Sequence, residues 1–349
     1  MVSRPKKILI TGISGNIGIE LLQQLKTTNQ LDGISVFVRD SKKNRKLLAS
    51  YSNLISIFWG DMMDRSSLIP ACTNQEVVIH LAGLIPPAFH ENDARSFNIN
   101  VEGTRNIIST LEEHAPNAFL VFSSSVAVYG DRLKTCEIRV GDSLDPEQID
   151  QYGRAKIQTE ADIQNSTLNW TILRLSAIMG VGNHKVSGII FHVPLDTAME
   201  ICTIRDTARA FLNAPDHLEQ LNQKIFNLGG GSECRISYHG FLSRAFTSFG
   251  MGKLNFPEYT FARCNFHCGH YMDGDDLETI LHFQSDNMDS YFERFHAGVH
   301  PLQRFFTRPF AGIAKWYLRT LSEPYKAFKS QNKEEMIRYF GTSNLNKHD

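Results

Sequence analysis

Residues 7–18 have the sequence KILITGISGNIG, an apolar run that passes directly into three glycines spaced three apart. The run predicts a short buried strand, and the apolar residues that follow it recur at helical spacing. Glycine permits both a tight turn and the close approach of another group to the backbone. The stretch therefore predicts a β-turn-α unit whose helix N-terminus can bind a pyrophosphate. The turn residues expected to contact a dinucleotide are Gly12, Ser14, Gly15, Asn16, Ile17 and Gly18.

The alternation of strand and helix continues to about residue 176. Continuous β-branched runs, buried on both faces, are typical of parallel sheets. We therefore predict a Rossmann-like, doubly wound α/β fold, with ligands at the carboxyl ends of its strands. Beyond the first unit, the expected strands are 33–39, 54–60, 76–83, 118–125 and 170–176, and the expected long helices are about 94–114 and 149–164.

Composition limits the class of protein. Hydrophobic residues make up 42% of the 349 residues, which excludes global disorder, and the net charge of −1 argues against a nucleic-acid binder that works by bulk charge. Six scattered cysteines favour a reducing compartment. The N-terminus leaves no room for a signal peptide, and no apolar stretch approaches the roughly 20 residues that span a bilayer. We expect a cytoplasmic protein.

The chain is expected to have three parts. Residues 1–180 form the dinucleotide-binding core with the catalytic residues, and residues 181–300 form a smaller substrate lobe interleaved with the last core strands. Residues 301–349 carry nine basic and four acidic residues among many aromatic ones. This extension suits the surface of an anionic membrane, a helix packed on the body or an oligomer contact, and its three prolines interrupt any single long helix.

The end of the second expected strand bears on cofactor choice. Arg39 stands at the strand end and Asp40 follows it. A guanidinium can hold the 2′-phosphate of NADP, whereas a carboxylate accepts from the 2′-hydroxyl of NAD. The position of Arg39 favours NADP over NAD. The alternative is that these charges simply lie on the exposed start of a helix.

Five further motifs follow the glycine turn in order: GDMMD (60–64), HLAG (80–83), NINVEGT (98–104), SSSVAVYG (123–130) and YGRAK (152–156). The ordered set resembles the extended short-chain dehydrogenase/reductases, in the group of NAD(P)-dependent epimerases and dehydratases. The resemblance implies that Tyr152 and Lys156 also bind the cofactor. It further implies cofactor contacts by Asp61, Met62, Leu81, Ala82, Gly83 and Ser123, and catalytic roles for Asn100, Ser125, Tyr152 and Lys156.

The chemistry of the last motif agrees with this resemblance. Tyr152 and Lys156 are four residues apart on an expected helix, so their side chains share one face. An ammonium and the positive charge of an oxidised nicotinamide should lower the pKa of the phenol, which lets Tyr152 act as acid and base on an alcohol. Ser125 can hydrogen-bond the same oxygen. It is preferred to Ser124 because residues 128–130 align with the family's VYG.

The substrate is less well specified. Sugar-nucleotide epimerases of this family usually have an Asn where this chain has Ala177, which favours the reductase branch. We predict an NAD(P)-dependent oxidoreductase or epimerase acting on a secondary alcohol or ketone, including sugar nucleotides. The alternatives are an NADP-dependent reductase of the dihydroflavonol-reductase or hydroxysteroid-dehydrogenase type and a non-catalytic NAD(P)-sensing regulator. The expected partners are a small-molecule substrate and a second copy in a homodimer.

Two other features invite functional readings. Cys264, His267, Cys268 and His270 could suggest zinc, but an extended stretch would place His267 on the face opposite the others. We therefore expect no metal site. His80, the first residue of HLAG, precedes the expected cofactor loop and is expected to be a buried strand histidine with satisfied hydrogen bonds.

Overall fold

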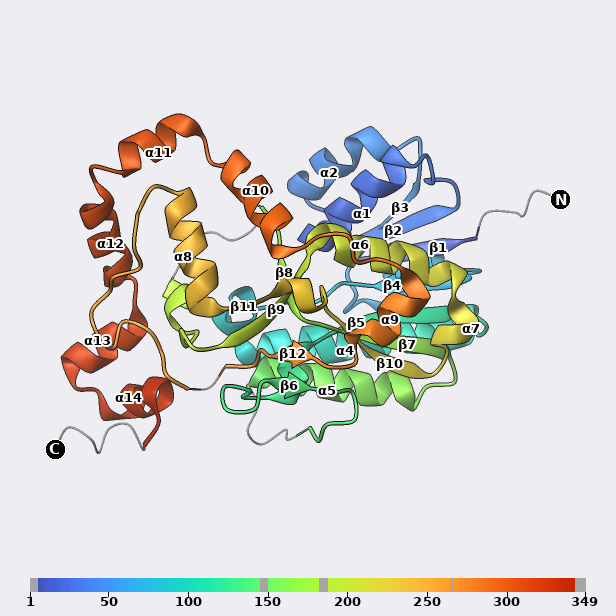
Figure 1. The fold of residues 1–349 in the computed structure, drawn as a ribbon. Coiled ribbons are helices and arrows are strands. Elements are labelled where there is room, and N and C mark those ends of the chain that lie inside the picture. The colour runs from blue at the N-terminus through green and yellow to red at the C-terminus, as the bar shows by residue number, and fades with distance from the viewer. Residues whose placement is uncertain (1–5, 145–149, 182–187, 265, 343–349) are drawn as a thin grey trace.

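The computed structural model describes residues 6–144, 150–181, 188–264 and 266–342. Its centre is a parallel sheet of seven strands in the order β10-β7-β5-β4-β1-β2-β3 (Figure 1). This order reverses at β1, as in doubly wound folds, and confirms the predicted fold class. The strands are β1 (Ile8–Thr11), β2 (Ile34–Val38), β3 (Ser56–Trp59), β4 (Val77–His80), β5 (Phe119–Ser125), β7 (Asn169–Leu175) and β10 (Lys224–Leu228).

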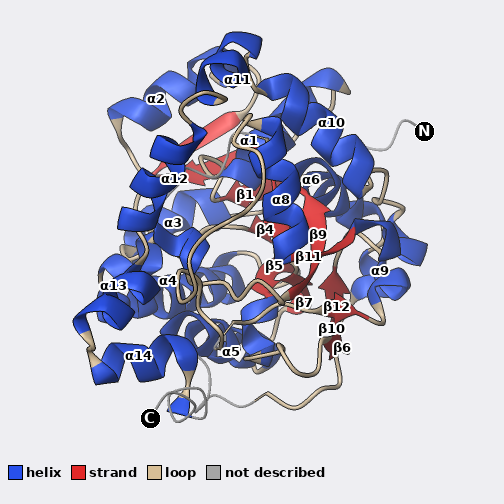
Figure 2. Cartoon of the chain, turned by 60° about the vertical axis from the view of Figure 1, so that its left-hand side comes forward, coloured by secondary structure: helices blue, strands red, loops and turns tan. Residues whose placement is uncertain are grey.

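Helices cover both faces of this sheet, as Figure 2 shows. Alternate residues of the same strand enter different cores: Ile10 packs with α1 and α6, whereas Leu9 packs with α3, α4 and α5. This is why the strands are apolar at every position rather than at every second one. The helices are α1 (Asn16–Thr27), α2 (Lys42–Leu48), α3 (Arg65–Cys72), α4 (Asp93–His114), α5 (Gln151–Gln164) and α6 (Ile204–Asn213). The helix expected over residues 149–164 corresponds to α5, and residue 149 lies outside the described residues.

A smaller lobe lies beyond the carboxyl ends of the main strands. Its three-stranded sheet has the order β11-β9-β8, and β6 pairs with β12 in a second short sheet. One hydrophobic cluster joins these strands to α8 and α10. Within residues 181–300, β10 pairs with β7 at the edge of the main sheet, so the segment expected to form the lobe also contributes a core strand. The elements of this lobe are β6 (Glu137–Ile138), β8 (Ala177–Met179), β9 (Ala198–Thr203), β11 (Arg235–Ser237), β12 (His270–Tyr271) and α8 (Tyr238–Ser248). Two further helices, α7 (Leu218–Leu221) and α9 (Gly274–Leu281), pack with the core of the main sheet.

The C-terminal residues form a chain of short helices that arcs beside α8 (Figure 1). They are α10 (Met288–Gly298), α11 (Pro301–Thr307), α12 (Ala311–Thr320), α13 (Glu323–Ser330) and α14 (Lys333–Phe340). Pro301 and Pro324 lie in the first turns of α11 and α13, where a missing N–H costs nothing, and Pro309 separates α11 from α12. None of the helices in the described part of the chain is long and apolar enough to cross a membrane.

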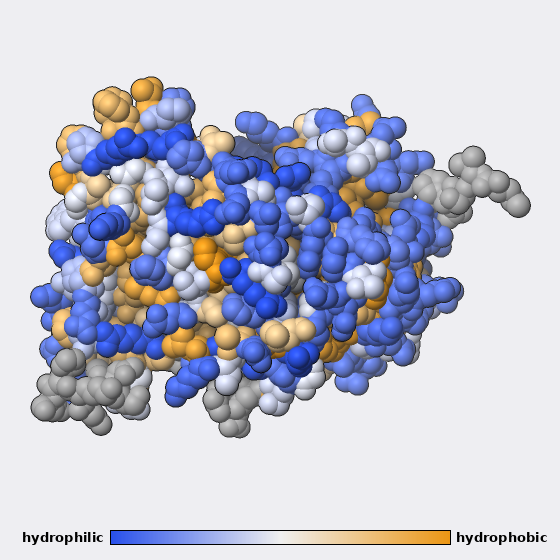
Figure 3. Space-filling view, viewed as in Figure 1, coloured by the Kyte–Doolittle hydropathy of each residue, from blue (hydrophilic) through white to orange (hydrophobic). Residues whose placement is uncertain are grey.

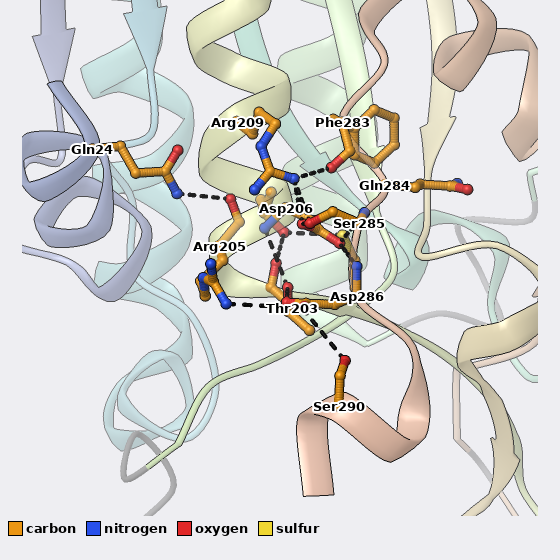
Figure 4. Close-up of polar contacts among 12 residues, drawn as sticks. Gln24, Thr203, Arg205, Asp206, Arg209, Phe283, Gln284, Ser285, Asp286 and Ser290 are labelled. Atoms are coloured by element: carbon orange, nitrogen blue, oxygen red, sulfur yellow. Dashed lines mark hydrogen bonds and ion pairs between the residues drawn. The ribbon is translucent and has the colours of Figure 1, made fainter. Parts of the chain in front are cut away.

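The buried carboxylate of Asp206 ties this C-terminal region to the body of the molecule (Figure 4). Its Oδ2 accepts from the backbone N–H groups of Ser285, at 3.0 Å, and Asp286, at 2.9 Å. Its Oδ1 accepts from Arg209 at 2.7 Å, and Thr203 donates to Asp286 at 2.8 Å. These bonds hold the connection between α9 and α10 against the start of α6.

Candidate active site

The glycine turn fits tightly against the neighbouring strand. Gly12 has φ of +75°, and a Cβ there would lie 2.6 Å from both the carbonyl carbon of Leu81 and the amide nitrogen of Ala82. A Cβ at Gly18 would lie 2.5 Å from the Cα of Ile13, so the third glycine lets α1 pack on its own turn. The first glycine therefore serves the backbone conformation and the close approach of two loops at the reversal point of the sheet.

The N-terminus of α1 remains open for an anion. Gly15 occupies the N-cap position, and no side chain caps the helix. Gly15 and Asn16 are exposed, and Ser14 and Ile17 are half-buried. The first N–H groups of a helix have no partner within it and lie at the positive end of its dipole. The turn therefore fits the pyrophosphate of a dinucleotide.

At the end of β2 the two charged residues differ in availability. The carboxylate of Asp40 accepts two hydrogen bonds of 2.6 Å from Arg45, and this contact lowers the pKa of Asp40. Arg45 also lies over the ring of Trp59, with its guanidinium carbon 5.0 Å from the centroid. Arg39 is exposed, and its side chain has no hydrogen bond or ion pair to another described residue. Arg39 is thus the charge at this strand end that is open to a ligand.

The GDMMD stretch follows β3 at the same edge of the sheet. Asp61 is exposed, and its Oδ1 accepts from the backbone N–H of Met63 at 3.0 Å. The Met62 side chain packs against Gly103 of α4, and its carbonyl accepts from Asn106 at 3.0 Å. Met62 therefore anchors the loop, and Asp61 presents a carboxylate beside it.

His80 organises the loop of Leu81, Ala82 and Gly83. Its Nε2 lies 3.0 Å from the hydroxyl of Thr104, which itself donates to the Asn100 carbonyl, so Nε2 carries the proton. Its Nδ1 then accepts from Thr11, at 2.7 Å, and the Thr11 oxygen accepts from the N–H of Ala82. Burial lowers the pKa of His80 to about 3. The structure confirms the expected buried histidine with satisfied hydrogen bonds.

Asn100, on α4, clamps the end of that loop. Its Oδ1 accepts from the backbone N–H of Leu84 at 2.7 Å, and its Nδ2 donates to the Leu84 carbonyl at 2.9 Å. A Cβ at Gly83 would lie only 3.3 Å from the same Oδ1. The amide therefore holds the loop in place in this structure.

The three serines that end β5 have different environments. Ser123 donates to the His80 carbonyl at 3.1 Å. Ser124 donates to the buried carboxylate of Glu160, so its hydroxyl is committed to the core. Ser125 accepts from the N–H of Ala127 at 3.2 Å and hydrogen-bonds the phenol of Tyr152. This difference supports the choice of Ser125 over Ser124.

Tyr152 and Lys156 lie on one face of α5, whose first turn is capped by Asp150 accepting from the N–H of Gly153 at 2.8 Å. Lys156 donates to the Ser123 carbonyl at 2.7 Å and lies over the Phe122 ring, 4.6 Å from its centroid. Its ammonium is 6.0 Å from the centroid of the Tyr152 ring. Phenol, ammonium and the Ser125 hydroxyl thus converge at the carboxyl end of β5.

Burial dominates the pKa of Tyr152 in the protein alone. Burial raises it to about 12, although the hydrogen bond with Ser125 opposes the rise. Burial also lowers the pKa of Lys156 to about 8, with Glu160 opposing that shift. The predicted lowering of the phenol's pKa applies to the site with an oxidised nicotinamide bound and stays a prediction; in the protein alone desolvation is the largest influence on this pKa.

Sequence reasoning missed two neighbours of this site. Phe89 is fully buried and meets the Tyr152 ring edge to face, with centroids 5.5 Å apart. Glu160 pairs with the buried guanidinium of Arg174 at 2.7 Å. The four-residue spacing of Lys156 and Glu160 could have indicated that both lie on the inner face of α5. Nothing in the local pattern marks Phe89.

The cysteine and histidine stretch does not form a ligand set in the part of the chain that the structure describes. Cys268 is buried, the Cys264 thiol contacts the Arg338 carbonyl at 3.6 Å, and His270 belongs to β12. Residue 265 lies outside the described residues. No group of three His, Cys, Asp or Glu side chains within the described ranges is arranged to hold a metal ion.

Comparison with known proteins defines the class. The model of the NAD dependent epimerase/dehydratase family matches residues 8–229. The chain therefore belongs to this family, whose members bind NAD. It is 30% identical over 201 residues to the UDP-glucose 4-epimerase of Pisum sativum and 32% identical over 207 residues to that of Neisseria meningitidis serogroup C. These matches cover 53% and 54% of this chain and 55% and 57% of those proteins, so the chain matches about half the length of these relatives.

Solved structures share the fold. The UDP-glucose 4-epimerase of Thermotoga maritima, solved with UDP-glucose, superposes with a TM-score of 0.67 at 19% identity, covering 83% of this chain and 97% of that one. The enzyme of Bifidobacterium longum, solved with NAD+ and UDP, gives 0.63 at 18% identity, covering 86% and 98%. At such identities the likeness establishes the fold alone.

Proposed function

We propose that this protein is an NAD(P)-dependent enzyme that transfers hydride to or from a secondary alcohol or ketone, with Tyr152 as the acid and base. The observation that carries the proposal is the convergence of Tyr152, Ser125 and Lys156 at the strand ends, beside a glycine turn open to a pyrophosphate. Retention of all three side chains argues against the non-catalytic sensor. Within this proposal, residues 1–180 supply most of the core, and residues 181–300 supply the substrate lobe, which is interleaved with the last core strands.

A bound nicotinamide dinucleotide would supply the hydride chemistry. Because its pKa is raised to about 12, Tyr152 holds its proton at neutral pH and suits donation to a carbonyl oxygen that is becoming an alcohol. The reverse direction requires the phenolate, which the positive charge of Lys156 would favour. Ser125 would hydrogen-bond the oxygen in both its alcohol and carbonyl forms.

We infer that NADP is preferred to NAD. Arg39 is exposed and open at the end of β2, while Asp40 is engaged by Arg45. A free guanidinium can hold a 2′-phosphate in forked geometry, and an engaged carboxylate is less able to accept from a 2′-hydroxyl.

For the substrate, the relatives favour a sugar nucleotide, and UDP-glucose is the first compound to try. A second candidate, an NADP-dependent ketone or aldehyde reductase, is favoured by Ala177 and by the pairing of two arginines, one at the end of β7 and one in the substrate lobe. The buried guanidinium of Arg174 is paired with Glu160, and Arg235 pairs with the buried Glu200 at 3.0 Å. Cations that are already neutralised contribute little to binding a diphosphate.

The experiment compares the wild-type chain with Tyr152→Phe. The variant keeps its affinity for NADPH and loses at least about 100-fold in turnover, because only the proton-transferring oxygen is removed. Conversion of UDP-glucose to its C4 epimer without net change in the nicotinamide identifies an epimerase, whereas oxidation of NADPH with a ketone identifies a reductase. Turnover that is unchanged in Tyr152→Phe would refute the proposed role.

A further inference from the structure

Helices α11 and α12 carry an unusual concentration of exposed apolar side chains. Seven of the fourteen large hydrophobic side chains that are exposed in the described part of the chain lie within residues 302–317. Each of the seven is between 57% and 69% exposed. We call them the aromatic patch: Leu302, Phe305, Phe306, Phe310, Ile313, Trp316 and Tyr317. Figure 3 shows hydrophobic side chains gathered on the same edge of the molecule, over α11.

The patch lies on one side of two consecutive helices. Leu302, Phe305 and Phe306 of α11 follow the spacing i, i+3, i+4, and so do Ile313, Trp316 and Tyr317 of α12. The other side of α12 presents Ala314, Leu318 and Leu321 to the core of the substrate lobe. A surface helix is normally apolar on its inner side and polar on its outer side, whereas α12 is apolar on both. The inner side of α12 packs on the core of the substrate lobe, and the outer side is suited to contact another apolar surface outside the chain.

The sequence that carries the patch has charges of a single sign. Between Glu293 and Glu323 the sequence contains five basic residues and no acidic one. Four of the five lie on or between these two helices: Arg304, Arg308, Lys315 and Arg319.

None of these four cations pairs with a carboxylate in the described structure. Arg304 donates to the Val299 carbonyl at 3.0 Å, and Lys315 donates to the Lys253 carbonyl at 2.7 Å. Arg319 lies over the ring of Tyr325, with its guanidinium carbon 5.3 Å from the centroid. Contacts to neutral groups leave the positive charges uncompensated, so the patch attracts anions.

Exposed apolar side chains beside unpaired cations favour one kind of binding partner over another. A symmetric dimer through the patch would bring the same surface of two copies together, and the cations beside each patch would then lie near their counterparts in the other copy. Repulsion between like charges opposes that contact. An anionic bilayer surface instead offers negative headgroups to the cations and an apolar interior to the phenylalanines, while tryptophan and tyrosine suit the boundary between the two.

We propose that the aromatic patch binds the surface of an anionic lipid bilayer, with α11 and α12 lying in the interface and the substrate lobe above it. This inference is independent of the proposed catalytic function. It assigns a role to part of the extension from residue 301, for which membrane contact and packing on the body were alternatives. The inner side of α12 packs on the body, and the outer side contacts lipid.

The test uses the full chain and sedimentation with large vesicles. One preparation is phosphatidylcholine alone, and the other contains one part phosphatidylglycerol to three parts phosphatidylcholine. The protein sediments with the phosphatidylglycerol vesicles, and raising the salt concentration weakens the interaction because it screens the cations. Fluorescence from Trp316, which is exposed in the free protein, shifts to the blue on binding.

Matched variants distinguish vesicle binding by the aromatic patch from nonspecific adsorption of the protein to lipid. Phe305→Ser with Phe306→Ser removes apolar contact and lowers vesicle binding at least about tenfold. Arg308→Glu reverses one charge and lowers it at least about fivefold. Leu54→Ser and Lys224→Glu make similar changes at exposed sites outside the patch and leave binding unchanged. Thermal unfolding of each variant establishes that it folds.

Three results would overturn the proposal. The first is no sedimentation with phosphatidylglycerol vesicles at low salt. The second is binding that the Phe305→Ser, Phe306→Ser variant does not reduce. The third is a dimer, detected by light scattering, that the same variant dissociates while vesicles bind neither protein; this would assign the patch to a second copy of the chain.

Discussion

Substitution of Gly12 by alanine tests the glycine turn that positions the whole site. At φ of +75° an alanine costs about 1 to 2 kcal/mol in backbone strain. Its Cβ would also lie 2.6 Å from backbone atoms of Leu81 and Ala82, which cannot rotate away. Overpacking of this kind adds about 1 to 3 kcal/mol. Gly12→Ala therefore lowers the free energy of unfolding by about 2 to 5 kcal/mol, and it weakens NADPH binding because the turn must shift.

Two other glycines separate these contributions. Gly252 has φ of +69° with nothing within 4 Å of its Cβ position, so Gly252→Ala costs only the backbone strain. Gly141 also has open space, without the positive φ, so Gly141→Ala is neutral or slightly stabilising. Urea unfolding of the three variants provides the comparison. If Gly12→Ala costs no more than Gly252→Ala, the close approach of the turn to residues 81 and 82 is wrong.

Three further predictions concern charge. Glu160→Gln leaves the buried guanidinium of Arg174 without its anion, so urea unfolding shows a free energy of unfolding that is lower by about 3 to 5 kcal/mol. Adding Arg174→Met restores much of this loss, whereas a loss below about 1 kcal/mol in Glu160→Gln alone would contradict the pairing. The pKa of Lys156 is about 8 in the folded protein and 10.5 ordinarily, so between these pH values the unfolded chain holds a proton that the folded chain has released. The free energy of unfolding of the wild type, relative to that of Lys156→Met, therefore rises with pH over this range by up to about 3 kcal/mol. A difference that does not change with pH would refute the lowered pKa. Arg39→Gln weakens NADPH binding about 10- to 100-fold and leaves NADH binding unchanged in fluorescence titrations, whereas an equal effect on both would remove the basis for preferring NADP.

The sequence was most informative where chemistry depends on local spacing. The glycine turn, the strand ends and the Tyr152 to Lys156 spacing are set within a few residues, so their helices and strands could be predicted closely. The choice of Ser125 over Ser124 stays a prediction; in the structure Ser124 donates to Glu160, and Ser125 hydrogen-bonds Tyr152.

Features that depend on residues far apart in the chain could not be predicted in this way. The Asp206 carboxylate accepts hydrogen bonds from the backbone of Ser285 and Asp286, which lie 79 and 80 positions away, and no local sequence pattern indicates such partners. The pKa of Tyr152 depends on burial by Phe89 and its surroundings, so the raised value emerges only from the fold. The positions of the prolines did predict breaks in the C-terminal helices, although not which sides of those helices remain exposed.

The central claim is that the turn at residues 12–18 and the site around Tyr152 bind a nicotinamide dinucleotide for hydride transfer. The most direct measurement is a fluorescence titration of the full chain with NADPH and with NADH. The account predicts saturable binding of at least one of them with a Kd below about 1 mM, the upper end of ordinary affinities for enzyme ligands, and a clear loss in Gly12→Ala. No saturable binding of either dinucleotide would contradict it.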